Sequence, residues 1–179
     1  MAMRSDDVTA LDCAIDPSGH GSASAQSTSG SPAVTGQGET PIAEPHSCPT
    51  IVVLDDEADA AASISQGLTL QRLTAIPFTS DDAVLSATAS SRVDAFVLDW
   101  CLGARTALGL VRALRNRVAT HSTPIFILSG SLSMNGRPLD GQLLAALELF
   151  QLHYRAKPIS CARLARDIIA AIGSLQTTR

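Results

Sequence analysis

Short runs of apolar residues recur along the chain from about residue 50 onward, each bounded by polar or helix-breaking residues. Several are continuous rather than alternating, which is typical of strands buried on both faces of a parallel sheet. The segments predicted as strands are Ile51–Leu54, Thr74–Thr79, Val93–Leu98, Pro124–Leu128 and Leu152–Ala156. Pro77 lies in the second segment and cannot donate a backbone hydrogen bond, so we expect that strand at a sheet edge.

Segments with helical spacing of apolar residues separate the predicted strands. The first predicted helix follows Asp55-Asp56-Glu57 and runs to about Leu73. The others run from Ser80 to about Ser90, from about Ala107 to Asn116, from Leu143 to Phe150, and onward from Ser160. Ser80 and Ser160 are good N-cap residues. The last helix is expected to bury one face, formed by Leu164, Ile168, Ile169 and Ile172.

The alternation of strand and helix, five times over, predicts an α/β fold. We expect a flavodoxin-like (βα)5 fold, with a doubly wound five-stranded parallel sheet in strand order 2-1-3-4-5. This order makes the first and third strands neighbours at the topological switch point, where ligands bind beyond the carboxyl ends of the strands. Those two ends are Asp55-Asp56 and Asp99.

Residues 1–48 differ in composition from the rest of the chain. From Pro17 to Gly38 nearly every residue is Ser, Gly, Ala, Thr or Pro, so we predict a disordered tail over 1–48 and one domain over 49–177. The net charge is −4, and residues 49–179 hold twelve basic and eleven acidic residues. That balance, with no effector segment after the last helix, predicts no direct binding of nucleic acid.

The four cysteines are scattered and show no C-x-x-C spacing, which favours free thiols in a reducing compartment over disulfides or a zinc site. The N-terminus lacks the apolar core of a signal peptide, and no apolar run approaches the length of a membrane span. We therefore expect a cytoplasmic protein without membrane contact.

Polar residues end four of the five predicted strands. They are Asp55 with Asp56, Asp99, Ser129 and Lys157. Three carboxylates at one sheet edge repel one another, and Mg²⁺ suits such a site because it takes its remaining ligands from water and phosphoryl groups. The alternative is that the acids merely cap helices. Acids on both sides of the switch point, with a hydroxyl and an ammonium group on the next two strands, count against that alternative.

Two residue types occur in this region and nowhere else in the chain. Lys157 is the only lysine, against twelve arginines, and a lysine ammonium is a compact binder of phosphate. Tyr154 is the only tyrosine, although taken alone it indicates core or half-exposed packing. Ser129 offers a hydroxyl to a phosphoryl oxygen beside the small Gly130, although a Ser-Gly pair is more often a turn.

The chain from about Thr50 to Leu175 resembles the receiver domain of two-component response regulators, in the stand-alone single-domain form. The motifs are Val53-Leu54-Asp55-Asp56-Glu57, Phe96-Val97-Leu98-Asp99, Ile127-Leu128-Ser129-Gly130 and Tyr154-Arg155-Ala156-Lys157-Pro158. Two loops differ from the usual pattern. The loop Trp100–Ala107 lacks Pro-Gly, and the segment Ser131–Asp140 is longer than is common.

The resemblance implies phosphorelay signalling, in which Asp99 accepts a phosphoryl group from a sensor histidine kinase or a histidine phosphotransfer protein. It implies that Mg²⁺ is held by Asp56, Asp99 and the backbone carbonyl of Cys101, and that Asp55 acts mainly through water. Lys157 and the metal would neutralise charge on the transferring group.

The resemblance also assigns a switch pair, Ser129 and Tyr154. Ser129 would bond the new phosphoryl oxygen, and Tyr154 would follow it inward and change the surface offered to an unknown downstream protein. No enzymatic activity is expected beyond self-phosphorylation and autodephosphorylation.

Two other functions remain open at this point. A pseudo-receiver would be a constitutive interaction module that never turns over phosphate. A metal-dependent phosphatase or hydrolase would need a second acid close after the nucleophile. The positions after Asp99 are instead Trp100, Cys101, Leu102 and Gly103.

Overall fold

The computed structural model describes residues 48–130, 133–134, 137–138 and 140–177. The predicted disordered tail lies outside these residues, apart from Cys48, as do parts of the long segment 131–140.

Five strands form one parallel sheet in the order β2-β1-β3-β6-β9. They are β1 (Thr50–Leu54), β2 (Thr74–Phe78), β3 (Ala95–Asp99), β6 (Ile125–Ser129) and β9 (His153–Ala156). The predicted order 2-1-3-4-5 is confirmed, with β6 and β9 as the fourth and fifth strands. Pro77 lies in the edge strand β2, where it pairs with Val53 on one side only.

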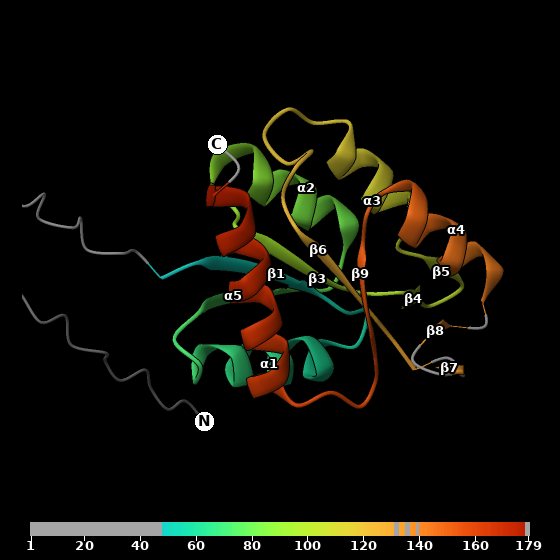
Figure 1. Ribbon diagram of the computed structural model, residues 1–179, viewed down its shortest axis with the longest axis horizontal. Coiled ribbons are helices and arrows are strands. Elements are labelled where there is room, and N and C mark those ends of the chain that lie inside the picture. The colour runs from blue at the N-terminus through green and yellow to red at the C-terminus, as the bar shows by residue number, and fades with distance from the viewer. Residues whose placement is uncertain (1–47, 131–132, 135–136, 139, 178–179) are drawn as a thin grey trace, which may run out of the picture. The chain divides into compact units, whose positions relative to one another are not determined.

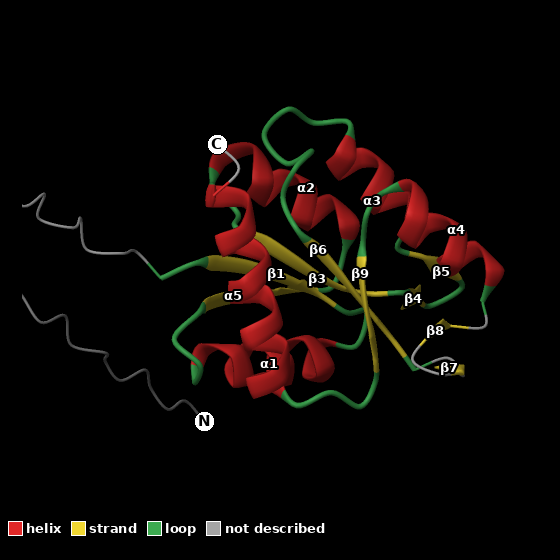
Figure 2. Ribbon diagram, viewed as in Figure 1, coloured by secondary structure: helices red, strands yellow, loops and turns green. Residues whose placement is uncertain are grey.

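Helices cover both faces of the sheet (Figures 1 and 2). One face carries α1 (Ala58–Thr69) and α5 (Cys161–Thr177), and the other carries α2 (Asp81–Ser90), α3 (Leu108–Arg115) and α4 (Gly141–Leu149). Alternate residues of the central strands enter two separate cores, so that Val53 packs with α1 and α5 whereas Val52 packs with α2, α3 and α4. None of the helices that the structure describes is long and apolar enough to cross a membrane.

Several predicted boundaries were wrong by one or two residues, and one by more. The first helix ends at Thr69 instead of Leu73, because the chain turns through Arg72 at a φ of 64°. α4 begins at Gly141, before the predicted Leu143, because Asp140 caps it. Ile169 was wrongly placed on the buried face of the last helix and is 51% exposed, since the sheet is met by Leu164, Ala165 and Ile168.

Two short antiparallel hairpins lie within segments that the sequence predicted only as loops. The first joins β4 (Cys101–Leu102) to β5 (Arg105–Thr106), and Gly103 makes its turn at a φ of 62°. The second joins β7 (Ser133–Met134) to β8 (Arg137–Pro138). The first hairpin follows Asp99 directly and therefore borders the site described below.

Candidate functional site

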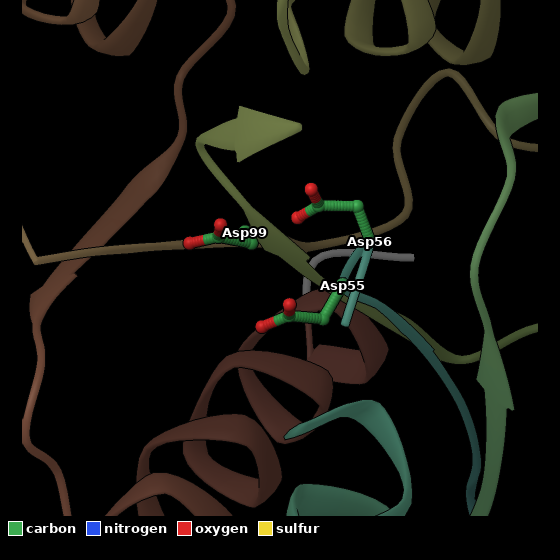
Figure 3. Close-up of side chains that lie close together, drawn as sticks. All are labelled: Asp55, Asp56 and Asp99. Atoms are coloured by element: carbon green, nitrogen blue, oxygen red, sulfur yellow. The ribbon is translucent and has the colours of Figure 1, made fainter. Parts of the chain in front are cut away.

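Three carboxylates meet at the carboxyl ends of β1 and β3. The two strands are parallel neighbours with Leu54 opposite Leu98, so Asp55 and Asp56 leave the sheet beside Asp99. One oxygen from each carboxylate lies within 4.8 Å of the others (Figure 3). Asp55 is buried, Asp99 is partly buried and Asp56 is exposed. The sequence-based expectation that these acids converge is met.

Lys157 reaches the same cluster from the end of β9. Its Nζ lies 2.9 Å from Asp55 Oδ2 and 3.0 Å from Asp99 Oδ1, so that one ammonium group bridges two carboxylates. Its backbone N–H donates to the carbonyl of Ser129 at 2.8 Å, which fixes where the side chain starts. Asp55 Oδ1 accepts the Glu57 N–H at 3.1 Å, which orients the other end of that carboxylate.

The electrostatic balance of this cluster favours a bound cation. Burial raises the pKa of the Asp99 carboxyl, against the lowering effect of Lys157, and the charges of Asp55 and Asp56 raise it further. Burial acts to lower the pKa of Lys157, but its hydrogen bonds to Asp55 and Asp99 outweigh this and leave that pKa raised. Three carboxylates therefore face one ammonium group, an all-oxygen donor set that suits Mg²⁺.

The predicted switch residues lie on the next two strands. Ser129 is the last residue of β6 and is fully buried. Tyr154 lies in the adjacent β9, opposite Ile127, and packs against the core shared with α3 and α4. Its hydroxyl is buried and has no hydrogen-bond partner among the residues that the structure describes. A Cβ at Gly130, the next residue, would meet no atom of the described residues within 4 Å.

The hairpin after Asp99 brings in residues that the sequence did not suggest. Trp100 is fully buried, and its Nε1 donates to Asp140 Oδ2 at 2.9 Å. Arg105 forms an ion pair with Asp81 at the start of α2. A Cβ at Gly103 would lie 3.8 Å from Asp56 Oδ2, so the hairpin turn borders the carboxylates. Asp140 could have been recognised as an N-cap, but its bond to Trp100 could not.

Searches with sequence found no matching family model and a small number of relatives. The chain is 28% identical over 124 residues to the transcriptional regulatory protein PrrA of Mycobacterium tuberculosis, covering 69% of this chain and 50% of that protein. It is 29% identical over 126 residues to PrrA of Mycobacterium leprae, covering 70% and 51%. The chain thus spans about half the length of the curated relatives it matches.

Solved structures of similar fold are numerous. A receiver domain of a Francisella response regulator aligns with a TM-score of 0.59 and 20% identity, covering 71% of this chain and 98% of that one. A CheY-like receiver domain from Methanospirillum hungatei aligns with a TM-score of 0.62 and 15% identity, covering 74% and 100%. The Vibrio cholerae chemotaxis protein CheY4 aligns with a TM-score of 0.60 and 16% identity, covering 69% and 98%.

Fold and sequence similarity agree on the class of protein. The described domain has the flavodoxin-like fold of CheY-type receiver domains, and its similarity in sequence is to response regulators. The chain is thus similar to response regulator receiver domains, and the domain that the structure describes shares their fold.

Proposed function

We propose that this domain is a phosphorylation-dependent switch in a two-component phosphorelay. Asp99 accepts a phosphoryl group from a sensor histidine kinase or a histidine phosphotransfer protein, and the loaded domain changes its binding to a downstream protein. The observation that carries the proposal is the position of Lys157, which bridges Asp55 and Asp99 at the edge where Asp56 joins them. A cluster that only capped helices would not require this bridging ammonium group.

The transfer itself forms one bond and breaks one bond. A carboxylate oxygen of Asp99 attacks phosphorus, and the phosphorus–nitrogen bond of the donor phosphohistidine breaks as its imidazole leaves. Lys157 stays charged and stabilises the negative charge on the transferring group, the effect that contributes most to phosphoryl transfer. Mg²⁺, held by Asp56, Asp99 and the backbone carbonyl of Cys101, with Asp55 acting through water, would neutralise further charge on the phosphoryl oxygens.

The proposed switch begins at Ser129. Its hydroxyl lies at the end of the strand next to that of Asp99, where it can bond a new phosphoryl oxygen. The hydroxyl of Tyr154 is buried and has no hydrogen-bond partner within the described residues. Because an unpaired buried hydroxyl is costly, the ring can move to a position where the hydroxyl gains a partner once Ser129 has moved. The two states differ in local packing near β9 and α4, and phosphorylation shifts their populations.

Trp100 provides a direct test, because it is the only tryptophan and follows Asp99 in the chain. We expect its fluorescence to change when Mg²⁺ and beryllofluoride, a mimic of the phosphoryl group, are added together. Asp99→Asn should abolish the response. Asp94→Asn, at an acid before the same strand, should retain it. A folded wild-type protein that showed no response would instead be a pseudo-receiver.

The remaining expectations about partners belong to the same proposal. The relatives are named transcriptional regulatory proteins, which counts against the prediction that no nucleic acid is contacted. A location in the cytoplasm, the absence of membrane contact and the absence of enzymatic activity beyond self-phosphorylation and autodephosphorylation are likewise proposed.

A further inference from the structure

The hairpin that follows Asp99 touches the N-terminus of α4. Trp100 Nε1 donates to Asp140 Oδ2 at 2.9 Å, and Thr106 Oγ1 lies at a hydrogen-bond distance of 3.5 Å from Gln142 Oε1. Trp100 and Thr106 stand at the two ends of the hairpin. Asp140 and Gln142 stand on either side of the first residue of α4. The contact therefore joins the segment beside the phosphoacceptor to one helix terminus.

The carboxylate of Asp140 is shared between the hairpin and the helix. Its Oδ1 accepts the backbone N–H groups of Gln142 at 2.8 Å and Leu143 at 3.1 Å, which caps α4. Its Oδ2 accepts the indole N–H of Trp100. The backbone hydrogen bond from Leu143, followed by the bond from Trp100, lowers the pKa of Asp140, so the carboxylate stays ionised and both bonds are charge-assisted.

Trp100 cannot move independently of its surroundings. The side chain is fully buried, in the same core as Leu143 and Ala146 of α4. Its backbone N–H donates to Leu128 at 2.8 Å, and its carbonyl accepts from Ala107 at 3.0 Å. A displacement of the chain just after Asp99 is therefore passed to α4, because close-packed cores transmit strain.

We propose that Trp100 and Asp140 are positioning residues that couple the phosphorylation state of Asp99 to the first turn of α4. This link starts from a different residue than the Ser129–Tyr154 pair, and we expect the response of the first turn of α4 to depend on it. The inference rests on the proposed function, because it needs a phosphoryl group at Asp99.

Two substitutions break the Trp100–Asp140 bond in different ways. Trp100→Phe removes the indole N–H, keeps an aromatic ring in the core and leaves the α4 cap intact. Asp140→Ser removes the acceptor for Trp100 while the serine hydroxyl can still cap the helix. The matched control is Ser80→Ala, which removes the N-cap of α2, a bond of 3.4 Å to Ala83 that has no part in this link.

The experiment loads each full-length protein with Mg²⁺ and beryllofluoride and follows loading by fluorine NMR, which does not depend on tryptophan. Hydrogen exchange of the α4 segment, residues 142–146, is compared before and after loading. In the wild type and in Ser80→Ala we expect exchange rates in this segment to change by about threefold or more. In Trp100→Phe and Asp140→Ser the proteins load, but the α4 change is lost.

Thermodynamic linkage supplies a second readout that a purely structural role would not alter. If loading acts on α4 through this bond, the coupling is reciprocal. Breaking the bond should then change the apparent affinity for Mg²⁺–beryllofluoride by about the factor by which loading changes α4 exchange. The double variant should shift it no further than either single variant.

The outcomes separate this inference from the proposed function. Loading of the wild type without an α4 change, or an α4 change that persists in either variant, overturns the coupling and leaves the proposed function standing. No loading of the folded wild type overturns both.

Discussion

The charge balance at Asp99 makes a prediction about folding stability whose sign depends on Mg²⁺. The perturbation is Asp99→Asn, which removes one negative charge with almost no change in shape. Asp99 is attracted by Lys157 at 3.0 Å and repelled by two carboxylates whose oxygens lie within 4.8 Å. At the dielectric constant of water the attraction is about 1.4 kcal/mol and each repulsion about 0.9 kcal/mol, so these terms nearly cancel.

Because the charge interactions nearly cancel, burial of Asp99 decides whether Asp99→Asn stabilises or destabilises the fold without metal. Burial is the largest cause of the raised pKa of Asp99, so the ionised carboxylate disfavours the folded state. We expect Asp99→Asn to raise the free energy of unfolding at pH 7 by about 1 kcal/mol. Between the ordinary pKa of 3.8 and the raised folded value the folded wild type binds more protons than the unfolded chain, so wild-type stability falls as the pH rises through this window. The advantage of the variant therefore shrinks as the pH is lowered toward 3.8.

The assay is urea unfolding of both proteins, with and without Mg²⁺. At a Mg²⁺ concentration of about ten times Kd, the wild type should gain about 1.4 kcal/mol and Asp99→Asn much less, which cancels or reverses the difference. The matched control is Asp94→Asn. Asp94 Oδ2 accepts the Thr50 N–H at 2.9 Å and its Oδ1 pairs with Arg92 at 3.0 Å, so this variant should lose about 1 kcal/mol.

Two results would refute this reasoning about the Asp99 site. One is an Asp99→Asn protein that is clearly less stable than the wild type without metal. The other is an equal gain from Mg²⁺ in the wild type and in Asp99→Asn.

Three further predictions concern single side chains. Lys157→Met should slow phosphoryl transfer from acetyl phosphate by about 100-fold in single-turnover mass measurements, and a loss below about tenfold would contradict its role. Arg115→Met should lower the free energy of unfolding by about 2–3 kcal/mol, because the partly buried guanidinium of Arg115 donates to three backbone carbonyls. The control Arg112→Met, at an exposed position, should change the free energy of unfolding by less than about 0.5 kcal/mol. Burial and then the charge of Arg155 lower the pKa of His153, so the unfolded chain takes up a proton before the folded protein does, and wild-type stability should fall as the pH drops below 6.5. Urea unfolding at several pH values should show a smaller loss of stability on acidification in His153→Gln than in the wild type.

The sheet could be predicted from the sequence because its three central strands, β1, β3 and β6, are buried on both faces. The continuous run Ile51–Leu54 sends alternate side chains into two cores, a pattern that a strand with one solvated face would not show. Pro77 restricted its strand to an edge, and parallel connection then brought the acids Asp55 and Asp99 together. The charged part of the site followed from the order of the strands alone.

The surroundings of the site could not be predicted in the same way. The two-residue strands of the hairpin after Asp99 are too short to show periodicity. The bond from Trp100 to Asp140 joins residues 40 positions apart, and no local pattern reports such a contact. Ile169 was misplaced because it follows Ile168 directly, and on a helix neighbouring residues point in different directions.

The measurement that tests the account most directly is the location of the phosphoryl group after incubation with acetyl phosphate and Mg²⁺. We predict that the intact protein gains the mass of one phosphoryl group, that peptide mapping places it on Asp99, and that chelation of the metal or Asp99→Asn abolishes the gain. A folded wild-type protein that gains no mass, or a gain that persists in Asp99→Asn, would contradict the account.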